Sequence, residues 1–317
     1  MKTEIVHTPV LMEETLQLLA PRTAGELMVD ATMGEGGHSY AFLSRFPTLR
    51  IIGIDADAAI QQVAKTRLHE FHPRVSFYTG WSQDFFPQLD EKPDTILIDL
   101  GVSLYHYEKS GRGFSFLKDE PLDMRIDTAQ GRSVAELIAT LSERDLADLL
   151  YYNADERYSR RIAHAIVDAR SRGRVNSTIT LAEIVRRALP VRPKRGAHPA
   201  TKTFQALRIA VNGELARLPA LLEAALHALA DGGRMGVISF HSLEDRMVKN
   251  FFRDTARDCL SSTAAPIGNI EGHRIVNLLT RKGIGAGADE IQRNPSSRSA
   301  RLRVIEKILQ ESNEDTR

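Results

Sequence analysis

The chain has 317 residues, of which 42% are hydrophobic and 26% are charged. Its 42 lysines and arginines nearly balance 41 aspartates and glutamates, so the formal net charge is only +1. This composition excludes a disordered, collagen-like or membrane-embedded chain. A net charge this small would not by itself attract a polyanion. We find neither an apolar run long enough for a membrane helix nor the apolar core of a signal peptide, so we expect a cytosolic protein of about two domains.

The first third of the chain alternates strand and helix patterns. In chain order these are a helix at 11–19, strands at 26–32, 50–55, 75–78 and 95–99, and helices at 38–46 and 58–71. The strand segments are continuously apolar and rich in β-branched residues. Such segments predict strands that are buried on both faces, and therefore a parallel sheet with helices on each side.

The pattern changes after Gly101. Residues 133–189 show only helical patterns, and a long helix predicted at 203–230 precedes strands at 233–240, 275–279 and 301–305. We expect the glycine-rich segment 283–287 to be a mobile loop. This order predicts one α/β domain formed by residues 1–105 and 200–317, with an all-helical domain inserted at 106–199.

A glycine cluster follows the first predicted strand. Residues 29–38 read Val-Asp-Ala-Thr-Met-Gly-Glu-Gly-Gly-His, which places glycines where a strand turns into a helix and backbone can approach a ligand. Asp55 ends the next strand, roughly 20 residues further on, and is placed to accept hydrogen bonds from ribose hydroxyls. A tight turn without a ligand is the alternative.

Two features separate the possible cofactors. A dinucleotide fingerprint would need glycine where the chain has Ser39, and the carboxylates of Asp30 and Glu35 would repel a pyrophosphate. We therefore favour S-adenosylmethionine.

Polar residues also follow two later strands of the predicted sheet. Asp99 ends the strand at 95–99, where its carboxylate could orient a nucleophilic amine, although a structural aspartate is the alternative. The segment 238–246 brings His241, Ser242 and Asp245 to the end of another strand, with an acid-rich first helical turn as the alternative.

The single cysteine narrows the chemistry further. Cys259 excludes an internal disulfide and a cysteine-rich zinc site, and His69 and His72 lack the carboxylates of a metal site, so we expect no metal. Methylation at carbon 5 of a pyrimidine needs a thiolate nucleophile, and Cys259 is far along the chain from the strand ends. A nitrogen or oxygen acceptor remains.

Positive charge is concentrated in one segment of this nearly neutral protein. Residues 157–202 hold twelve lysines and arginines against two acids, Asp168 and Glu183, which indicates a phosphate-binding surface. A second basic cluster comprises Arg293, Arg298, Arg301 and Arg303. Acidic partners within the protein are the alternative for both. The residues that we expect to contact nucleic acid are Arg192, Lys194, Arg195, His198, Lys202 and Arg298.

Seven segments, in order over nearly the whole chain, together resemble one family. They lie at 7–11, 30–39, 99–103 (Asp-Leu-Gly-Val-Ser), 112–116, 121–125, 198–209 and 238–246 (Ile-Ser-Phe-His-Ser-Leu-Glu-Asp-Arg). These segments are similar to those of the bacterial 16S ribosomal RNA cytosine-N4 methyltransferases, the RsmH/MraW family. The resemblance implies a class I methyltransferase fold, Rossmann-like with a mostly parallel sheet, that carries an inserted helical substrate-recognition domain.

The resemblance also implies the cofactor, the substrate and the site. The donor would be S-adenosyl-L-methionine, and the acceptor a cytosine in the decoding region of 16S ribosomal RNA within the small ribosomal subunit. Asp99 and His241 would be the catalytic residues. The cofactor would contact Gly36, Gly37, His38, Asp55, Trp81, Ser82, Asp99 and His106.

The chain departs from the family pattern at two places. His106 stands where the family has glutamine, and Ser296 stands where it has arginine. The Asp-Pro-Pro-Tyr signature of DNA amino-methyltransferases is absent, so a base-stacking aromatic would come from Tyr105 or Phe240. A DNA amino-methyltransferase and a catalytically silent ribosome-assembly factor remain as alternative functions.

Overall fold

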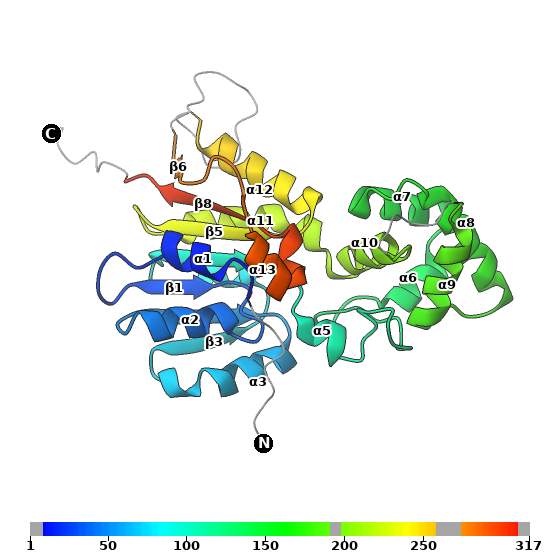
Figure 1. The fold of residues 1–317 in the computed structure, drawn as a ribbon, viewed down its shortest axis with the longest axis horizontal. Helices are drawn as coiled ribbons and strands as arrows, with labels where there is room; N and C mark the ends of the chain where they lie inside the picture. The colour runs from blue at the N-terminus through cyan, green and yellow to red at the C-terminus, as the bar shows by residue number, and fades with distance from the viewer. Residues whose placement is uncertain (1–8, 191–197, 258–273, 310–317) are drawn as a thin grey trace. The chain divides into compact units, whose positions relative to one another are not determined.

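The computed structural model describes residues 9–190, 198–257 and 274–309 (Figure 1). The chain forms two compact units. The first unit comprises Met1–Val102 and Arg217–Arg317, and the second comprises Ser103–Ala216. No helix among the described residues is long and apolar enough to cross a membrane.

The first unit is built on one sheet with the strand order β3-β2-β1-β4-β5-β8-β6. The strands are β1 (Leu27–Asp30), β2 (Arg50–Asp55), β3 (Val75–Thr79), β4 (Thr95–Asp99), β5 (Arg234–Ser239), β6 (Val276–Leu278), β7 (Ile284–Gly285) and β8 (Arg301–Lys307). Strands β1 to β5 pair in parallel, and β8 runs antiparallel to β5, β6 and β7. This topology confirms the predicted α/β fold with a mostly parallel sheet.

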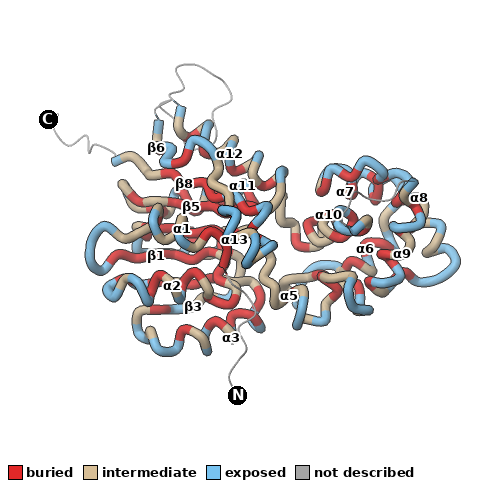
Figure 2. Tube along the Cα trace, viewed as in Figure 1, coloured by how far each residue is buried: buried red, intermediate tan, exposed pale blue. Residues whose placement is uncertain are grey.

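Both faces of the sheet are buried, as the apolar strand runs predict. On one face Val29, Ile96 and Val237 pack with α11 (Glu214–Ala228) and α12 (Ser242–Thr255). On the other face Met28 and Leu97 pack with α1 (Met12–Leu18), α2 (Gly37–Arg45) and α3 (Ala58–Arg67). Figure 2 shows the resulting buried interior of β1 and β5. Because successive strand residues point to opposite faces, a run of apolar residues supplies both cores.

The segment 283–287 differs from its prediction as a mobile loop. Ile284 and Gly285 form β7, which pairs with Leu302 and Arg301 of β8. A Cβ on Gly285 would meet only the far end of the exposed Arg301 side chain, so this pairing does not itself require glycine. Glycine content alone therefore indicated mobility where the chain forms a short edge strand.

The second unit is helical. Its helices are α5 (Leu104–Glu108), α6 (Val134–Thr140), α7 (Glu143–Ala154), α8 (Ser159–Arg172), α9 (Thr178–Ala188) and α10 (Thr201–Asn212). Helix α7 packs against both α8 and α10. The unit begins at Ser103 and ends at Ala216, so it contains α10, whereas the sequence predicts an insert that ends at 199.

One predicted helix, at 203–230, is two helices. Helix α10 ends at Gly213, whose φ of 61° is left-handed and whose N–H donates to the carbonyl of Ala210. Helix α11 then begins at Glu214. A left-handed glycine is a common way to end a helix, and this glycine ends α10 within a continuous helical pattern, shortly before the second unit ends at Ala216.

Candidate active site

Three neighbouring strands of the first unit each end in an aspartate. These residues are Asp30 on β1, Asp55 on β2 and Asp99 on β4. Strand β1 lies between the other two, and the chain passes from β1 to β2 on one side and later returns to β4 on the other. Ligands of open α/β sheets bind at such a switch point, outside the carboxyl ends of the strands.

The glycine turn after β1 is fixed by hydrogen bonds to the end of the neighbouring strand β2. Met33 donates its N–H to the carbonyl of Ile54 at 2.8 Å, and Gly34 donates to Asp55 Oδ2 at 2.8 Å. Gly34 and Gly36 adopt left-handed φ values of 54° and 73°. The turn therefore has a fixed conformation that residues with a Cβ rarely adopt.

Two of the glycines are explained by packing within the protein, without any ligand close to the backbone. A Cβ on Gly37 would lie 2.3 Å from Pro9 Cγ, and a Cβ on Gly36 would lie 3.0 Å from a Leu68 methyl carbon. These glycines let the start of α2 pack against the chain itself. Their proposed contact with a cofactor stays a prediction.

His38 lies in the first turn of α2, close to both Asp30 and Asp99. Its Nε2 is 3.6 Å from Asp99 Oδ2, which is too long for a hydrogen bond. Within the described residues, both ring nitrogens are buried and lack a hydrogen-bond partner. Buried polar atoms without partners are costly, so this pair of nitrogens fits a site that a polar ligand completes.

Asp30 is buried beneath this cluster. Its Oδ2 accepts a hydrogen bond from Ser39 Oγ at 2.7 Å. Burial raises the pKa of Asp30 to about 6, although the Ser39 hydroxyl and His38 act in the opposite direction, and the charge of Asp99 raises the pKa further. The site therefore holds two carboxylates whose mutual repulsion favours a cationic ligand.

Asp99 is oriented so that one of its oxygens remains available. Its Oδ1 accepts the N–H of Gly101 at 2.9 Å, and its backbone N–H donates to Thr32 Oγ1 at 2.6 Å. A Cβ on Gly101 would lie 2.6 Å from the Phe240 ring, so a larger residue there would force this ring to move. Asp99 Oδ2 makes no hydrogen bond to any residue in the described ranges, and it can accept an N–H from a ligand.

Asp55 serves the fold as well as the predicted ribose site. Its Oδ2 accepts from Gly34 and its Oδ1 accepts from the N–H of Asp57 at 2.8 Å. A carboxylate can accept several hydrogen bonds, so these contacts are compatible with the predicted role of Asp55 towards a ribose hydroxyl.

The loop after β3 is tied to the same edge of the sheet. Gly80 donates its N–H to the carbonyl of Asp55 at 2.9 Å, and the Ser82 hydroxyl donates to the carbonyl of Ala31. These bonds place Trp81 beside the ends of β1 and β2. The Arg217 guanidinium of α11 lies over the Trp81 ring, 4.3 Å from its centroid, a contact that no sequence signal indicates.

His241 is the N-cap of α12. Its Nδ1 accepts the N–H of Glu244 at 3.4 Å, and Glu244 Oε2 accepts the N–H of His241 at 3.3 Å. This reciprocal pair is a capping box with histidine in the place usually taken by serine or threonine. The structure gives His241 a structural role at a strand end, and its catalytic role stays a prediction.

The second basic cluster does not form one exposed surface. Arg303 is buried and makes two hydrogen bonds to Asp245, at 2.8 and 3.0 Å, so it cannot serve RNA. For this residue the alternative of an internal acidic partner is correct. Arg298 is exposed, as its predicted contact with RNA requires.

The other predicted site residues lie in the second unit or outside the described residues. His106 is buried on α5, with its ring 5.0 Å from that of Phe114. His198 stacks on Phe116 at 4.3 Å, and Lys202 donates to the carbonyl of Asp155 at 2.9 Å. Arg192, Lys194 and Arg195 lie outside the described residues, as does Cys259.

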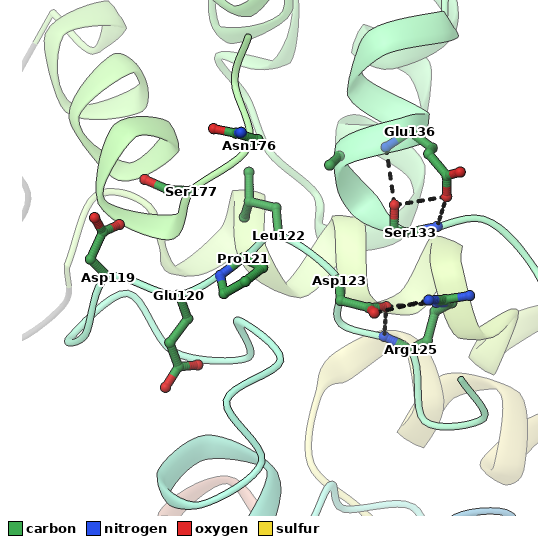
Figure 3. Close-up of a pocket in the computed structure, with 11 residues that line it drawn as sticks. Asp119, Glu120, Pro121, Leu122, Asp123, Arg125, Ser133, Glu136, Asn176 and Ser177 are labelled. Atoms are coloured by element: carbon green, nitrogen blue, oxygen red, sulfur yellow. Dashed lines mark hydrogen bonds and ion pairs between the residues drawn. The ribbon is translucent and has the colours of Figure 1, made fainter. Parts of the chain in front are cut away.

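The second unit also contains an open cleft of about 680 Å³, drawn in Figure 3. Apart from the exposed Asp119, the charged side chains that line it are engaged with neighbours. Asp123 pairs with Arg125, and Glu136 completes a capping box with Ser133. Glu120 accepts the N–H of Gly113 at 2.9 Å. The polar lining of this cleft thus stabilises local structure, and we assign it no ligand.

Comparisons with known proteins show the family of the chain. The model of the MraW methylase family matches residues 4–308. The chain is 51% identical to the ribosomal RNA small subunit methyltransferase H of Treponema denticola, over 96% of this chain and 98% of that protein. It is 44% identical to the protein of the same name from Syntrophobacter fumaroxidans, over 95% of this chain and 96% of that one.

Proposed function

Since the chain belongs to the MraW methylase family, we propose that it transfers a methyl group from S-adenosyl-L-methionine to the N4 amine of a cytosine in the decoding region of 16S ribosomal RNA. The full-length similarity to small-subunit ribosomal RNA methyltransferases supports the substrate class. The observation that carries the site is the buried group formed by Asp30, His38 and Asp99 at the switch point of the sheet, where both ring nitrogens of His38 lack a hydrogen-bond partner among the described residues.

When bound, the cofactor supplies a methyl group on a positively charged sulfonium, so the acceptor amine needs alignment more than a strong base. Asp99 Oδ2 accepts one N–H of the cytosine amine and so directs the nitrogen lone pair towards the methyl group. As the N–C bond forms, the amine becomes acidic and releases one proton, which the same carboxylate oxygen can take. Gly101 holds the other oxygen of Asp99 and fixes this orientation.

The remaining cofactor contacts come from the segments that follow each strand. After β1, Gly36, Gly37 and His38 contact the cofactor, and at the end of β2 Asp55 accepts hydrogen bonds from its ribose hydroxyls. Trp81 and Ser82 lie beside the adenine. Because Ser82 donates its only hydroxyl proton to Ala31, it can only accept a hydrogen bond from the adenine amine.

His106 is assigned to the same cofactor, and His241 shapes the pocket for the base. RNA is bound through Arg298 and through residues of the second unit, of which His198 and Lys202 lie in the described ranges. We take the assembled small ribosomal subunit as the partner, which places the reaction in the cytosol.

The direct test incubates the purified protein with S-adenosylmethionine and small ribosomal subunits, followed by nuclease digestion and mass spectrometry. We expect one N4-methylcytidine per subunit and no product from duplex DNA. Asp99→Asn should lower the rate of transfer at least 100-fold, because the amide oxygen lacks the charge that aligns and deprotonates the amine. Wild-type turnover in this variant would refute the role of Asp99.

Two further outcomes would support the alternatives. Methylation of duplex DNA in place of ribosomal RNA would identify a DNA amino-methyltransferase. Calorimetry that gives no heat with S-adenosylmethionine would identify a silent assembly factor. In cells that lack the protein, ribosomal RNA should lose one methyl group on one cytosine.

A further inference from the structure

The corner between α7 and α8 presents an unusual group of exposed aromatic rings. Tyr151, Tyr152 and Tyr158 are 50%, 68% and 41% exposed, and the first two pack edge to face with ring centroids 5.3 Å apart. We call residues 151–161 the α7–α8 corner. Tyrosine rings usually bury most of their surface, so three exposed rings within eight residues indicate a contact surface.

The corner also carries positive charge that the protein does not neutralise. Arg157, Arg160 and Arg161 are exposed and make no ion pair or hydrogen bond with residues in the described ranges. Elsewhere on the same unit, Arg172 pairs with Asp168 on α8, and Arg186 with Glu183 on α9. Among the described arginines of the basic segment 157–202, only Arg174 also lacks such a partner, so the corner gathers three of these four exposed cations.

The acids of the corner do not cancel these charges. Glu156 is buried, and its Oε1 accepts the N–H of Tyr158 at 2.9 Å. Asp155, at the end of α7, is exposed, but its backbone carbonyl accepts a hydrogen bond from the exposed Lys202 ammonium, so four exposed cations face this one exposed acid. The exposed charge of the corner is therefore positive, with aromatic rings between the cations.

We propose that the α7–α8 corner binds unpaired nucleotides of ribosomal RNA. This inference rests on the proposed function of the enzyme. Exposed tyrosine rings stack on bases, and the guanidinium groups contact the phosphates between them. The negatively charged phosphates of RNA complement these cations, so RNA is the occupant that the charge favours.

The test measures binding of the full-length protein to naked 16S ribosomal RNA and to small ribosomal subunits over a series of KCl concentrations. Tyr152→Ala should weaken binding to both by about tenfold, and Tyr152→Phe should retain wild-type affinity because the ring remains. The double variant Arg160→Ala and Arg161→Ala should reduce the slope of log affinity against log salt by about 1.4, or about 0.7 per phosphate contact. Arg172→Ala is the matched control and should change neither value, because its charge is already paired.

Three results would overturn the proposal. Wild-type affinity in Tyr152→Ala and in the double arginine variant would show that the corner does not bind the substrate. Loss of affinity for the subunit alone, with naked RNA bound normally, would identify a protein partner. An equal loss in Arg172→Ala would show a general charge effect. Circular dichroism and cofactor binding should remain unchanged in every variant, which excludes unfolding as the cause.

The proposed function has a separate readout. If the wild-type protein binds RNA through Tyr152 but transfers no methyl group, the enzyme assignment fails and the binding surface stands. If the wild-type protein methylates its substrate and the corner variants match it in binding and rate, the surface fails and the enzyme assignment stands.

Discussion

Replacement of Asp30 by asparagine should stabilise the protein above neutral pH. The pKa of this buried carboxyl is raised from an ordinary 3.8 to about 6 by desolvation. The folded state therefore favours the protonated form of Asp30. The stability that protonated Asp30 contributes is fully present below pH 3.8 and is lost as the pH rises to about 6. At about 1.4 kcal/mol per pH unit, the ionised carboxylate costs the fold about 3 kcal/mol at pH 8.

Asparagine avoids this cost because it does not ionise, and its amide oxygen can still accept the Ser39 hydroxyl. Its advantage over the wild type should grow by about 2 kcal/mol between pH 4.5 and pH 8. Urea unfolding followed by the emission of Trp81, the only tryptophan in the chain, measures this difference. Ser39→Ala removes a hydrogen bond that favours the charged form, so it should move the pH transition upwards. A difference between Asp30→Asn and wild type that does not change with pH would refute the reasoning.

Three other changes have defined outcomes. Arg217→Ala removes a cation–π contact with Trp81 that is worth about 0.5–2 kcal/mol. We therefore expect a shifted Trp81 emission and, in a fluorescence titration, severalfold weaker binding of S-adenosylmethionine. Unchanged affinity would show that Arg217 does not support the cofactor site. Arg303→Ala leaves Asp245 without its partner and should cost about 3 kcal/mol in urea unfolding without changing RNA affinity, whereas weaker RNA binding in a folded variant would restore Arg303 to the RNA surface. Gly37→Ala places a methyl group 2.3 Å from a proline carbon and should destabilise the fold by about 1–3 kcal/mol, so a wild-type melting temperature would contradict the packing role of this glycine.

The sheet could be predicted closely because its sequence signal is local. The segments 50–55 and 95–99 coincide with β2 and β4, since strands buried on both faces need continuous apolar runs. The division of the helix at Gly213 could not be predicted in this way. Glycine is tolerated within helices, and only the observed φ of 61° shows that this one ends α10.

The acids of the site were also predictable, because the carboxyl ends of parallel strands meet at one edge of a sheet. Asp55 and Asp99 follow from that rule alone, and Asp30 satisfies it equally. The partners of the other residues depend on segments that are distant in sequence. Asp245 and Arg303 are 58 residues apart, and no local pattern in the sequence joins them.

The free-energy cost of burying Asp30 and His38 at the strand ends supports a binding site independently of family membership. Natural domains are stable by only about 5–15 kcal/mol, and the ionised Asp30 alone consumes about 3 kcal/mol of this at pH 8. His38 adds two buried ring nitrogens without partners in the described structure, and apolar residues in both places would remove these penalties. The two residues lie together beside Asp99, at the point of the sheet where ligands bind. A cationic ligand with hydrogen-bonding groups would compensate both penalties at once, and S-adenosylmethionine has this chemistry.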